Sequence, residues 1–272
     1  MIFHQRAPPQ PLNGFIDYLW YWEDDVSSPG LDAIMPSRTV SLLVNLSRDE
    51  LNWYDGDDCL KQHRVRGAAV CGPHTRRFAI DACQPKMVGV QFSPGGAWPF
   101  FGPPTHEFKD RHVELDEIWG SDAGRLHQRL VQASAPSDKF DVLAEALLAR
   151  AHRSLEHHPA VALSLARFSH EPCASSVGAV AREADVSRKR LITLFEREVG
   201  FTPKLYLRVA RFQSLLSQIC HSACVDWAEV VERHGWYDQS HFIRDFREFS
   251  GLTPSQYLSR RRPSAQHVGL AD

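Results

Sequence analysis

An ungapped internal repeat constrains the fold of this chain more than any other feature of its sequence. The phrase GFTPKLYL at residues 200–207 returns as GLTPSQYL at residues 251–258. The same offset of 51 residues aligns the longer stretches 176–207 and 227–258 without a gap. A repeat of this length predicts two copies of one supersecondary unit.

Each copy of the repeat has the pattern of two short helices joined by a tight turn. In the first copy, the second helix would bury an apolar stripe that includes Leu191 and Phe195, at helical spacing. Ser187 in the first copy and Asp238 in the second are the expected N-caps of that helix. The repeat therefore predicts two helix-turn-helix units, at residues 176–202 and 227–253.

The repeated phrase reads as a helix end followed by a helix start. Gly200 and Gly251 stand where a helix C-terminus favours a residue with positive φ. The Thr-Pro pair two residues after each glycine supplies an N-cap and a first-turn proline for the next helix. After the first copy this next helix is long, and we expect it to join the two units at a fixed orientation.

The second helix of a helix-turn-helix unit fits the major groove of DNA, where its exposed side chains meet the base edges. Arginine and lysine suit guanine, glutamine suits adenine, and an apolar side chain suits the thymine methyl group. Ile192 and Ile243 are equivalent in the repeat and have two interpretations, a base contact or the cover of a neighbouring helix. The candidate DNA-binding residues are Arg188, Lys189, Ile192, Thr193, Gln239, Ser240, Ile243 and Arg244.

The formal net charge of −2 is divided unevenly along the chain. Residues 1–169 carry −4 and residues 170–272 carry +2, which is compatible with DNA binding by the C-terminal part. The alternatives are a helical interaction domain that binds no DNA and an architectural protein that binds DNA without sequence preference. The modest positive charge disfavours the architectural protein, because non-specific binding depends on phosphate neutralisation.

Residues 170–260 resemble the DNA-binding domain of the AraC/XylS family of bacterial transcription regulators. The resemblance is carried by VSRKRLITLFEREVGFTP at residues 186–203 and, most specifically, by HGWYDQSHFIRDFREFSGLTPSQY at residues 234–257. Relatives often carry polar or basic side chains where this chain has Ile192 and Thr193, so the resemblance implies no particular operator. It does imply base contacts from Lys189, Ile192, Thr193, Gln239, Ser240, Ile243 and Arg244.

The N-terminal part is rich in short apolar or alternating runs separated by turn signals, which favours a small β-sandwich or barrel. PSRTVSLLVNL at residues 36–46 and GVQFSPGGAWPFFG at residues 89–102 also resemble a sensor domain of some of these regulators. That resemblance implies a cupin-like barrel that binds a small effector and contributes to dimerisation. From Ala97 onward the apolar spacing becomes helical.

The sequence therefore predicts an α+β multidomain chain. A mostly-β, cupin-like N-terminal barrel with helices precedes an all-α domain of two helix-turn-helix units joined by a linker helix. The expected boundaries are a sensor and dimerisation domain at residues 1–158, a linker at 159–175, the AraC-type DNA-binding domain at 176–260, and a flexible tail at 261–272.

A β-barrel mouth lined by aromatic side chains with a few polar groups is a common ligand site. The alternative is that each tryptophan belongs to the core and that the polar groups lie on the rim. The helix expected at residues 139–155 either mediates dimerisation or packs on its own barrel, and the family resemblance favours dimerisation. The candidate effector-binding residues are Trp22, Arg38, Asn45, Trp53 and His74.

Motifs that would indicate an enzyme are missing from the sequence. Residues 1–120 hold no His-x-His pair, and the chain has no P-loop, dinucleotide or nucleophile-elbow motif. We therefore expect no catalytic residues, no metal and no cofactor. The alternative is a DNA-repair or modification enzyme that uses the helix-turn-helix domain for targeting and carries a reactive N-terminal cysteine. Cys71 and Cys83 lie in apolar runs, which argues against a reactive thiolate.

The expected partners follow from these assignments. Double-stranded DNA is the main partner, and an unidentified small-molecule effector, RNA polymerase and a second copy of the chain are candidates. No window approaches the roughly 18–20 apolar residues of a membrane helix, and the first residues do not form a signal-peptide pattern. The sequence thus predicts a cytoplasmic, nucleoid-associated protein with no membrane partner.

Overall fold

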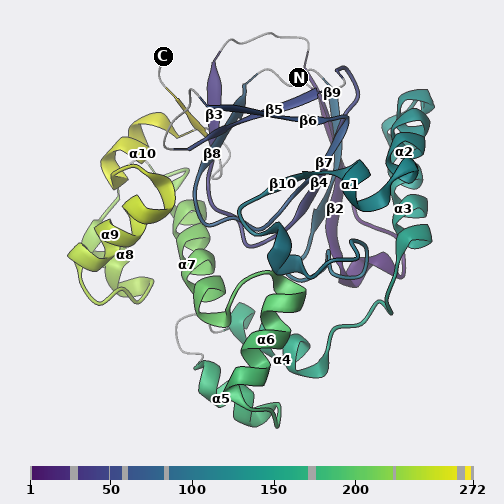
Figure 1. Cartoon of the computed structure of the whole chain (residues 1–272). Helices are drawn as coiled ribbons and strands as arrows, with labels where there is room; N and C mark the ends of the chain where they lie inside the picture. Colours follow the sequence, from purple (N-terminus) through teal and green to yellow (C-terminus); the bar gives the residue numbers. More distant parts are fainter. Residues whose placement is uncertain are drawn as a thin grey trace.

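A β-rich N-terminal half and a helical C-terminal half make up the computed structural model (Figure 1). The predicted α+β architecture is confirmed at this level. None of the described helices is long and apolar enough to cross a membrane. The structure describes residues 2–24, 30–48, 50–56, 61–82, 86–170, 176–222, 225–261 and 267–270.

The strands form two antiparallel sheets, as in the double-sheet architectures that include cupins. The six-stranded sheet has the order β1 (Ile2–Arg6), β2 (Ile16–Glu23), β9 (Lys86–Phe92), β4 (Ser41–Asn45), β7 (Ala68–Cys71) and β10 (His112–Glu114). The five-stranded sheet has the order β11 (His267–Gly269), β3 (Leu31–Ile34), β8 (Phe78–Asp81), β5 (Glu50–Asp55) and β6 (Gln62–Arg66).

Three helices pack on the six-stranded sheet: α1 (Leu115–Trp119), α2 (Ser121–Gln132) and α3 (Pro136–Arg150). Alternation along β9 turns Val88 and Val90 toward these helices, where they share one core cluster with Leu143 and Leu147 of α3. The apolar stripe of α3 therefore lies on its own domain, which is one of the two interpretations that the sequence left open. A dimeric role for the exposed side of α3 stays a prediction.

The two copies of the repeat fold into the same structure. The first unit consists of α5 (Val177–Glu183) and α6 (Arg188–Val199), and the second of α8 (Trp227–Arg233) and α9 (Gln239–Ser250). The long helix α7 (Pro203–Ile219) joins them, and α10 (Pro254–Arg260) follows the second unit. Each of the two expected glycines ends its helix with positive φ, 93° at Gly200 and 64° at Gly251.

The expected caps are present in both copies. The side chain of Ser187 accepts a hydrogen bond from the backbone of Arg190, and that of Asp238 accepts one from His241. Thr202 and Thr253 cap α7 and α10 in the same way, each just before its proline. Short-range chemistry therefore fixes the boundaries of these helices.

The expected linker at residues 159–175 is largely a helix in the structure. Residues Pro159–His170 form α4, and residues 171–175 lie outside the described part of the chain. Phe168 packs edge-on against Phe195 of α6, with 5.8 Å between ring centroids. Pro159, which favoured a linker, is instead the first residue of the helix, where its missing N–H costs nothing. By packing, α4 belongs to the DNA-binding half.

The expected flexible tail also differs from the structure. Residues His267–Gly269 form β11, which pairs with the edge strand β3 of the N-terminal half. Val268 lies opposite Ala33 and is fully buried, in a core cluster that also contains Phe212 of α7. Only three residues pair, with a partner more than 230 positions away, so no local pattern predicts this strand. The two halves thus share part of one core.

Candidate nucleic-acid interface

Helix α6 presents the first set of candidate DNA-binding side chains. Burial of Leu191 and Phe195 on one face turns Arg188, Lys189 and Thr193 to solvent. Ile192 is half-buried beside them. The exposed residues lie in the first half of the helix, which is the part that enters the major groove in helix-turn-helix proteins.

Helix α9 presents the second set in the same arrangement. Gln239, Ser240 and Arg244 are exposed, while Phe242 and Phe246 are buried. Ile243 is half-buried and packs against the core cluster of the C-terminal half. This packing agrees with the covering role, one of its two interpretations, whereas a base contact is not tested.

Among the described residues, the candidate cations on both helices have no acidic partner. In the part of the chain that the structure describes, Arg188, Lys189 and Arg244 form no ion pair. Other arginines nearby are engaged, for example Arg208, whose guanidinium lies 2.9 Å from Asp245. Exposed and unpaired guanidinium and ammonium groups suit phosphate or guanine contacts.

A buried carboxylate holds α9 against α7. Asp245 is 4% exposed and accepts hydrogen bonds from Arg208 at 2.9 Å and from the indole N–H of Trp236 at 3.1 Å. Asp245 is not among the predicted site residues, although its position three residues after Phe242 places it on the buried face of the helix. This pair orients the second candidate reading helix relative to the linker helix.

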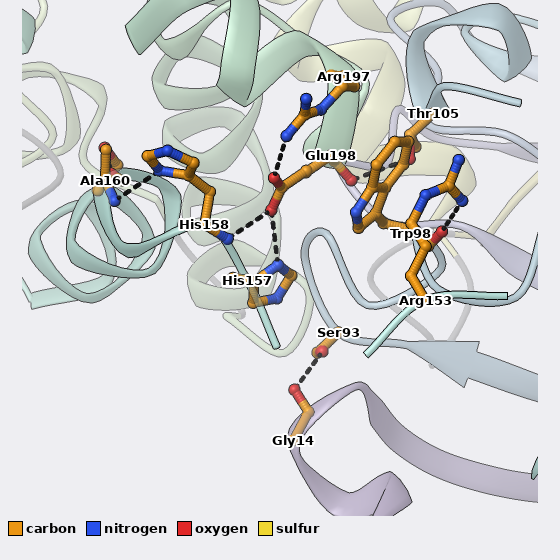
Figure 2. A network of polar contacts seen from close by, with 11 residues as sticks. Gly14, Ser93, Trp98, Thr105, Arg153, His157, His158, Ala160, Arg197 and Glu198 are labelled. Atoms are coloured by element: carbon orange, nitrogen blue, oxygen red, sulfur yellow. Dashed lines mark hydrogen bonds and ion pairs between the residues drawn. The ribbon is translucent and has the colours of Figure 1, made fainter. Parts of the chain in front are cut away.

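A second buried carboxylate lies at the end of α6, between the two halves of the molecule. Figure 2 shows that Glu198 receives hydrogen bonds from His157, from Arg197 and from the backbone N–H of His158, at 3.0–3.2 Å. Burial raises the pKa of Glu198, but these three donors outweigh burial and hold the pKa below its usual value. Glu198 is also absent from the predicted site residues, since its partners His157 and His158 are 40 or more residues away in the sequence.

Two of the expected effector-binding residues lie near each other in the N-terminal domain. Trp22 and Trp53 are half-buried and both pack against a small cluster formed by Leu51, Val65, Ala69 and Met87. The Trp53 ring is stacked on His63 and on His112, with centroid distances of 3.9 and 4.6 Å. Burial lowers the pKa of His112 to about 3, so this ring is neutral at pH 7.

The other three expected effector-binding residues lie elsewhere and have protein partners. Asn45 is buried and closes a turn, accepting from the backbone of Ser47 and of Arg48. His74 is buried between the backbone carbonyls of Gly72 and Met35. Arg38 lies over the ring of Tyr206 in α7, 5.3 Å from its centroid, and so reaches the other half of the chain.

The described part of the chain contains two free cysteines, and both are buried. They are Cys71 and Cys220, and burial raises the pKa of the Cys71 thiol to about 12. No group of three or more His, Cys, Asp or Glu side chains in the described ranges is arranged to hold a metal ion. Cys83 lies outside the described residues, as do Cys59, Cys173 and Cys224.

Two family models match the chain. One is described as a helix-turn-helix domain and matches residues 180–260, which include most of the first unit, the linker helix and the whole second unit. The other is described as a domain of unknown function, DUF6597, and matches residues 4–114, which include β2 to β10 and part of β1.

Similar proteins were found among curated sequences and solved structures. An "Uncharacterized HTH-type transcriptional regulator" of Haemophilus influenzae is 33% identical over 81 residues, 29% of this chain and 26% of that protein. The chain thus matches about a quarter of the length of this relative. A structure of ToxT from Vibrio cholerae is 11% identical with a TM-score of 0.48, covering 95% of this chain and 98% of that one. An unsaturated fatty acid-bound ToxT is 12% identical with a TM-score of 0.44, covering 88% and 94%.

Proposed function

We propose that this chain, in which an AraC-type helix-turn-helix domain follows a DUF6597 domain, is a sequence-specific DNA-binding transcriptional regulator. Both helix-turn-helix units read DNA in this proposal, α6 through Arg188, Lys189, Ile192 and Thr193, and α9 through Gln239, Ser240, Ile243 and Arg244. One chain then recognises two short blocks of sequence in successive major grooves, about 34 Å apart.

One observation carries the proposal. The two units expose matched sets of polar and cationic side chains at equivalent helix positions, while the opposite faces of both helices are buried. A helical interaction domain that binds no DNA does not require exposed polar and cationic side chains in the first half of both helices. The curated relative, a regulator of the helix-turn-helix type, agrees with this assignment over the 81 residues that match.

In-vitro selection of bound sequences from a random DNA pool, at about 0.15 M salt, tests the proposal. We expect a motif of two short blocks whose centres are about one helical turn, or 10–10.5 base pairs, apart. Uniform recovery of the pool with a steep dependence on salt would instead mean non-specific phosphate binding. If the protein retains no DNA in this selection, the proposal is contradicted for the effector-free protein. The selection would then be repeated in the presence of small molecules that bind the N-terminal domain.

We further propose that a small molecule bound between the two sheets of the N-terminal domain controls DNA binding. The half-buried rings of Trp22 and Trp53 support this location, because partly exposed aromatic side chains in a domain interior suit an apolar or aromatic ligand. Tryptophan fluorescence would report binding in a screen of small organic compounds. The same compound would then be titrated against the Trp53→Leu variant. If it quenches the fluorescence of the variant as strongly as that of the wild type, this site is excluded.

The remaining partners are proposals of the same kind. We propose a homodimer, contact with RNA polymerase when DNA is bound, and a location at the nucleoid in the cytoplasm. Analytical ultracentrifugation with and without operator DNA separates a monomer from a dimer. In-vitro transcription from a promoter that contains the selected motif reports an effect on RNA polymerase, as activation or as repression.

We propose no catalytic activity for the chain. The alternative, an enzyme with a nucleophilic cysteine, needs a thiol that ionises near neutral pH. The raised pKa of Cys71 keeps that thiol protonated, which supports a purely structural role. Iodoacetamide labelling of the native protein tests this, since rapid modification of one cysteine at pH 7 would favour the enzyme.

A further inference from the structure

The N-terminal domain contacts both helix-turn-helix units at equivalent positions, near the C-terminal ends of α6 and α9. The last carbonyls of an α-helix have no partner within the helix. In α6, the hydroxyl of Thr105 donates a hydrogen bond to the carbonyl of Glu198, at 2.9 Å. In α9, the backbone N–H of Arg77 donates to the carbonyl of Phe249, at 3.2 Å. Glu198 and Phe249 are equivalent positions of the 51-residue repeat.

The repeated glycines make this contact possible. A Cβ atom on Gly200 would lie 2.7 Å from the Pro73 ring and 3.1 Å from the methyl group of Thr105. A Cβ atom on Gly251 would lie 2.8 Å from Nε of Arg77. Each glycine therefore has two tasks, because it ends its helix with positive φ and also lets the N-terminal domain approach the helix end.

Two short stretches of the N-terminal domain make the contacts with the two units. We call residues 73–77, which connect β7 to β8, together with Thr105 of the 3-10 turn Thr105–Phe108, the docking segment. Its Pro73 end lies against the first unit and its Arg77 end against the second. The two units are thus attached to each other twice, through α7 and through the docking segment.

The docking segment is itself held firmly. The backbone of His74 exchanges two hydrogen bonds with Ser37, at 2.8 and 3.1 Å. Asp110 accepts a hydrogen bond from the backbone N–H of Thr75 at 2.6 Å, and its own N–H donates to the carbonyl of Pro73 at 2.9 Å. A segment pinned from two sides can transmit a fixed geometry to what it touches.

The contacts of the docking segment leave the candidate DNA-binding surfaces of α6 and α9 exposed. The docking contacts involve the last residues of each helix, whereas the exposed candidate residues, Arg188 to Thr193 and Gln239 to Arg244, lie five to ten residues earlier. At 1.5 Å rise per residue this is a separation of about 8–15 Å along the helix. The contact therefore does not cover the surface that would face DNA.

We propose that the docking segment is a positioning element for DNA reading, which fixes the two recognition helices at one separation and one angle. In consequence the N-terminal domain, and not α7 alone, determines which spacing of the two sequence blocks is bound tightly. This inference rests on the proposed function. The physical basis is preorganisation, since units already held in register lose less conformational freedom when both engage DNA.

The proposed role determines how DNA affinity depends on the spacing between the two sequence blocks. If the docking segment only stabilised the fold, its loss would leave this dependence unchanged. Each added base pair rotates the second block by about 35° and moves it by about 3.4 Å. A rigid pair of recognition helices cannot follow such a change, whereas a loosely joined pair can. The dependence of affinity on block spacing therefore measures how firmly the two units are held.

The experiment compares full-length proteins on a set of duplexes that carry the selected motif with zero to three additional base pairs between its blocks. Gly200→Asn places a side chain against Pro73 and Thr105, and Asn is the residue after glycine that best tolerates the left-handed cap. Thr105→Val removes the one hydroxyl that contacts the end of α6, at nearly constant shape, and leaves the glycine caps of α6 and α9 in place. Gly67→Asn is the matched control, because Gly67 also has positive φ, 59°, but a Cβ atom there meets nothing nearer than 3.9 Å.

For the wild type and for Gly67→Asn we expect affinity to fall by about tenfold or more on adding one or two base pairs. For Gly200→Asn and Thr105→Val we expect a fall of less than about threefold over the same series, with affinity for a single block unchanged. Should Gly200→Asn not fold, Thr105→Val decides alone. Wild-type spacing dependence in both variants would overturn the inference, because α7 would then suffice. Absence of any specific binding by the wild type would instead refute the proposed function.

Discussion

At the scale of single residues, Arg244 and Asp245 show how neighbours on one helix differ in role. Arg244 is exposed without an ion pair among the described residues, whereas Asp245 is buried and bound by Arg208. Arg244→Ala should weaken binding to the selected motif by about 1–3 kcal/mol and relax preference at one base pair. Titration of motif and random duplexes measures both effects.

Arg233→Ala, which removes an arginine paired with Glu229 on α8, is the control and should change neither the affinity nor the base preference. Equal losses on both duplexes would leave Arg244 only a phosphate contact.

Glu198 supplies a prediction about pH. Its folded-state pKa is lowered from 4.5, so its interactions stabilise the fold above about pH 4.5 and are lost as the pH falls through the folded pKa. Glu198→Gln should lower the free energy of unfolding at pH 7 by about 1–3 kcal/mol. Urea unfolding at several pH values measures this, and the difference from the wild type should shrink below pH 4.5. A difference that stays constant into the acid range would contradict the assignment.

The sequence predicted single residues well where their role depends on near neighbours. The exposed faces of α6 and α9 follow from helical periodicity, and the four caps follow from residue type. The expected effector-binding residues differ in this respect. Arg38 and His74 have partners set by long-range folding, which their sequence neighbourhood does not reveal. Asn45 instead closes a local turn with Ser47 and Arg48.

At the scale of elements, the helix caps of the second unit allow a matched pair of variants. Asp238→Ala removes the cap of the reading helix α9, and Asp226→Ala removes the cap of the supporting helix α8. Each should cost about 1 kcal/mol of stability. Only Asp238→Ala should also weaken recognition of the second sequence block, because α8 does not face the bases. In-vitro selection with both variants measures this, and identical motifs from the two would count against α9 as a reading helix.

Elements were predictable when their signals were local. The repeat, the glycines and the Thr-Pro pairs placed α5 to α10 within a few residues. By contrast, the sequence predicts a linker where α4 forms, because polar residues and Pro159 precede its apolar run. It predicts a tail where β11 forms, because the pairing partner β3 lies in the other half of the chain. Contacts of that range leave no periodicity in the sequence.

At the scale of the whole molecule, β11 and β3 join the two halves through one sheet. Val268→Asp would place a charge in a fully buried position and should detach the strand. We expect hydrogen exchange in residues 31–34 to rise by about tenfold or more, while β5 and β8 keep their protection. Mass spectrometry of peptic peptides measures this. Unchanged exchange in residues 31–34 would show that the tail strand does not protect β3.

The pairing of β11 with β3 also has a consequence during synthesis of the chain on the ribosome. β11 leaves the ribosome more than 230 residues after β3, which at 5–20 residues per second is a delay of roughly 10–50 s. Throughout that interval the outer edge of β3 offers unpaired N–H and carbonyl groups. On a crowded polysome, the finished tail of one copy can reach the waiting edge of another. Slower translation lengthens the interval during which this edge can pair with a strand of another chain instead of with β11.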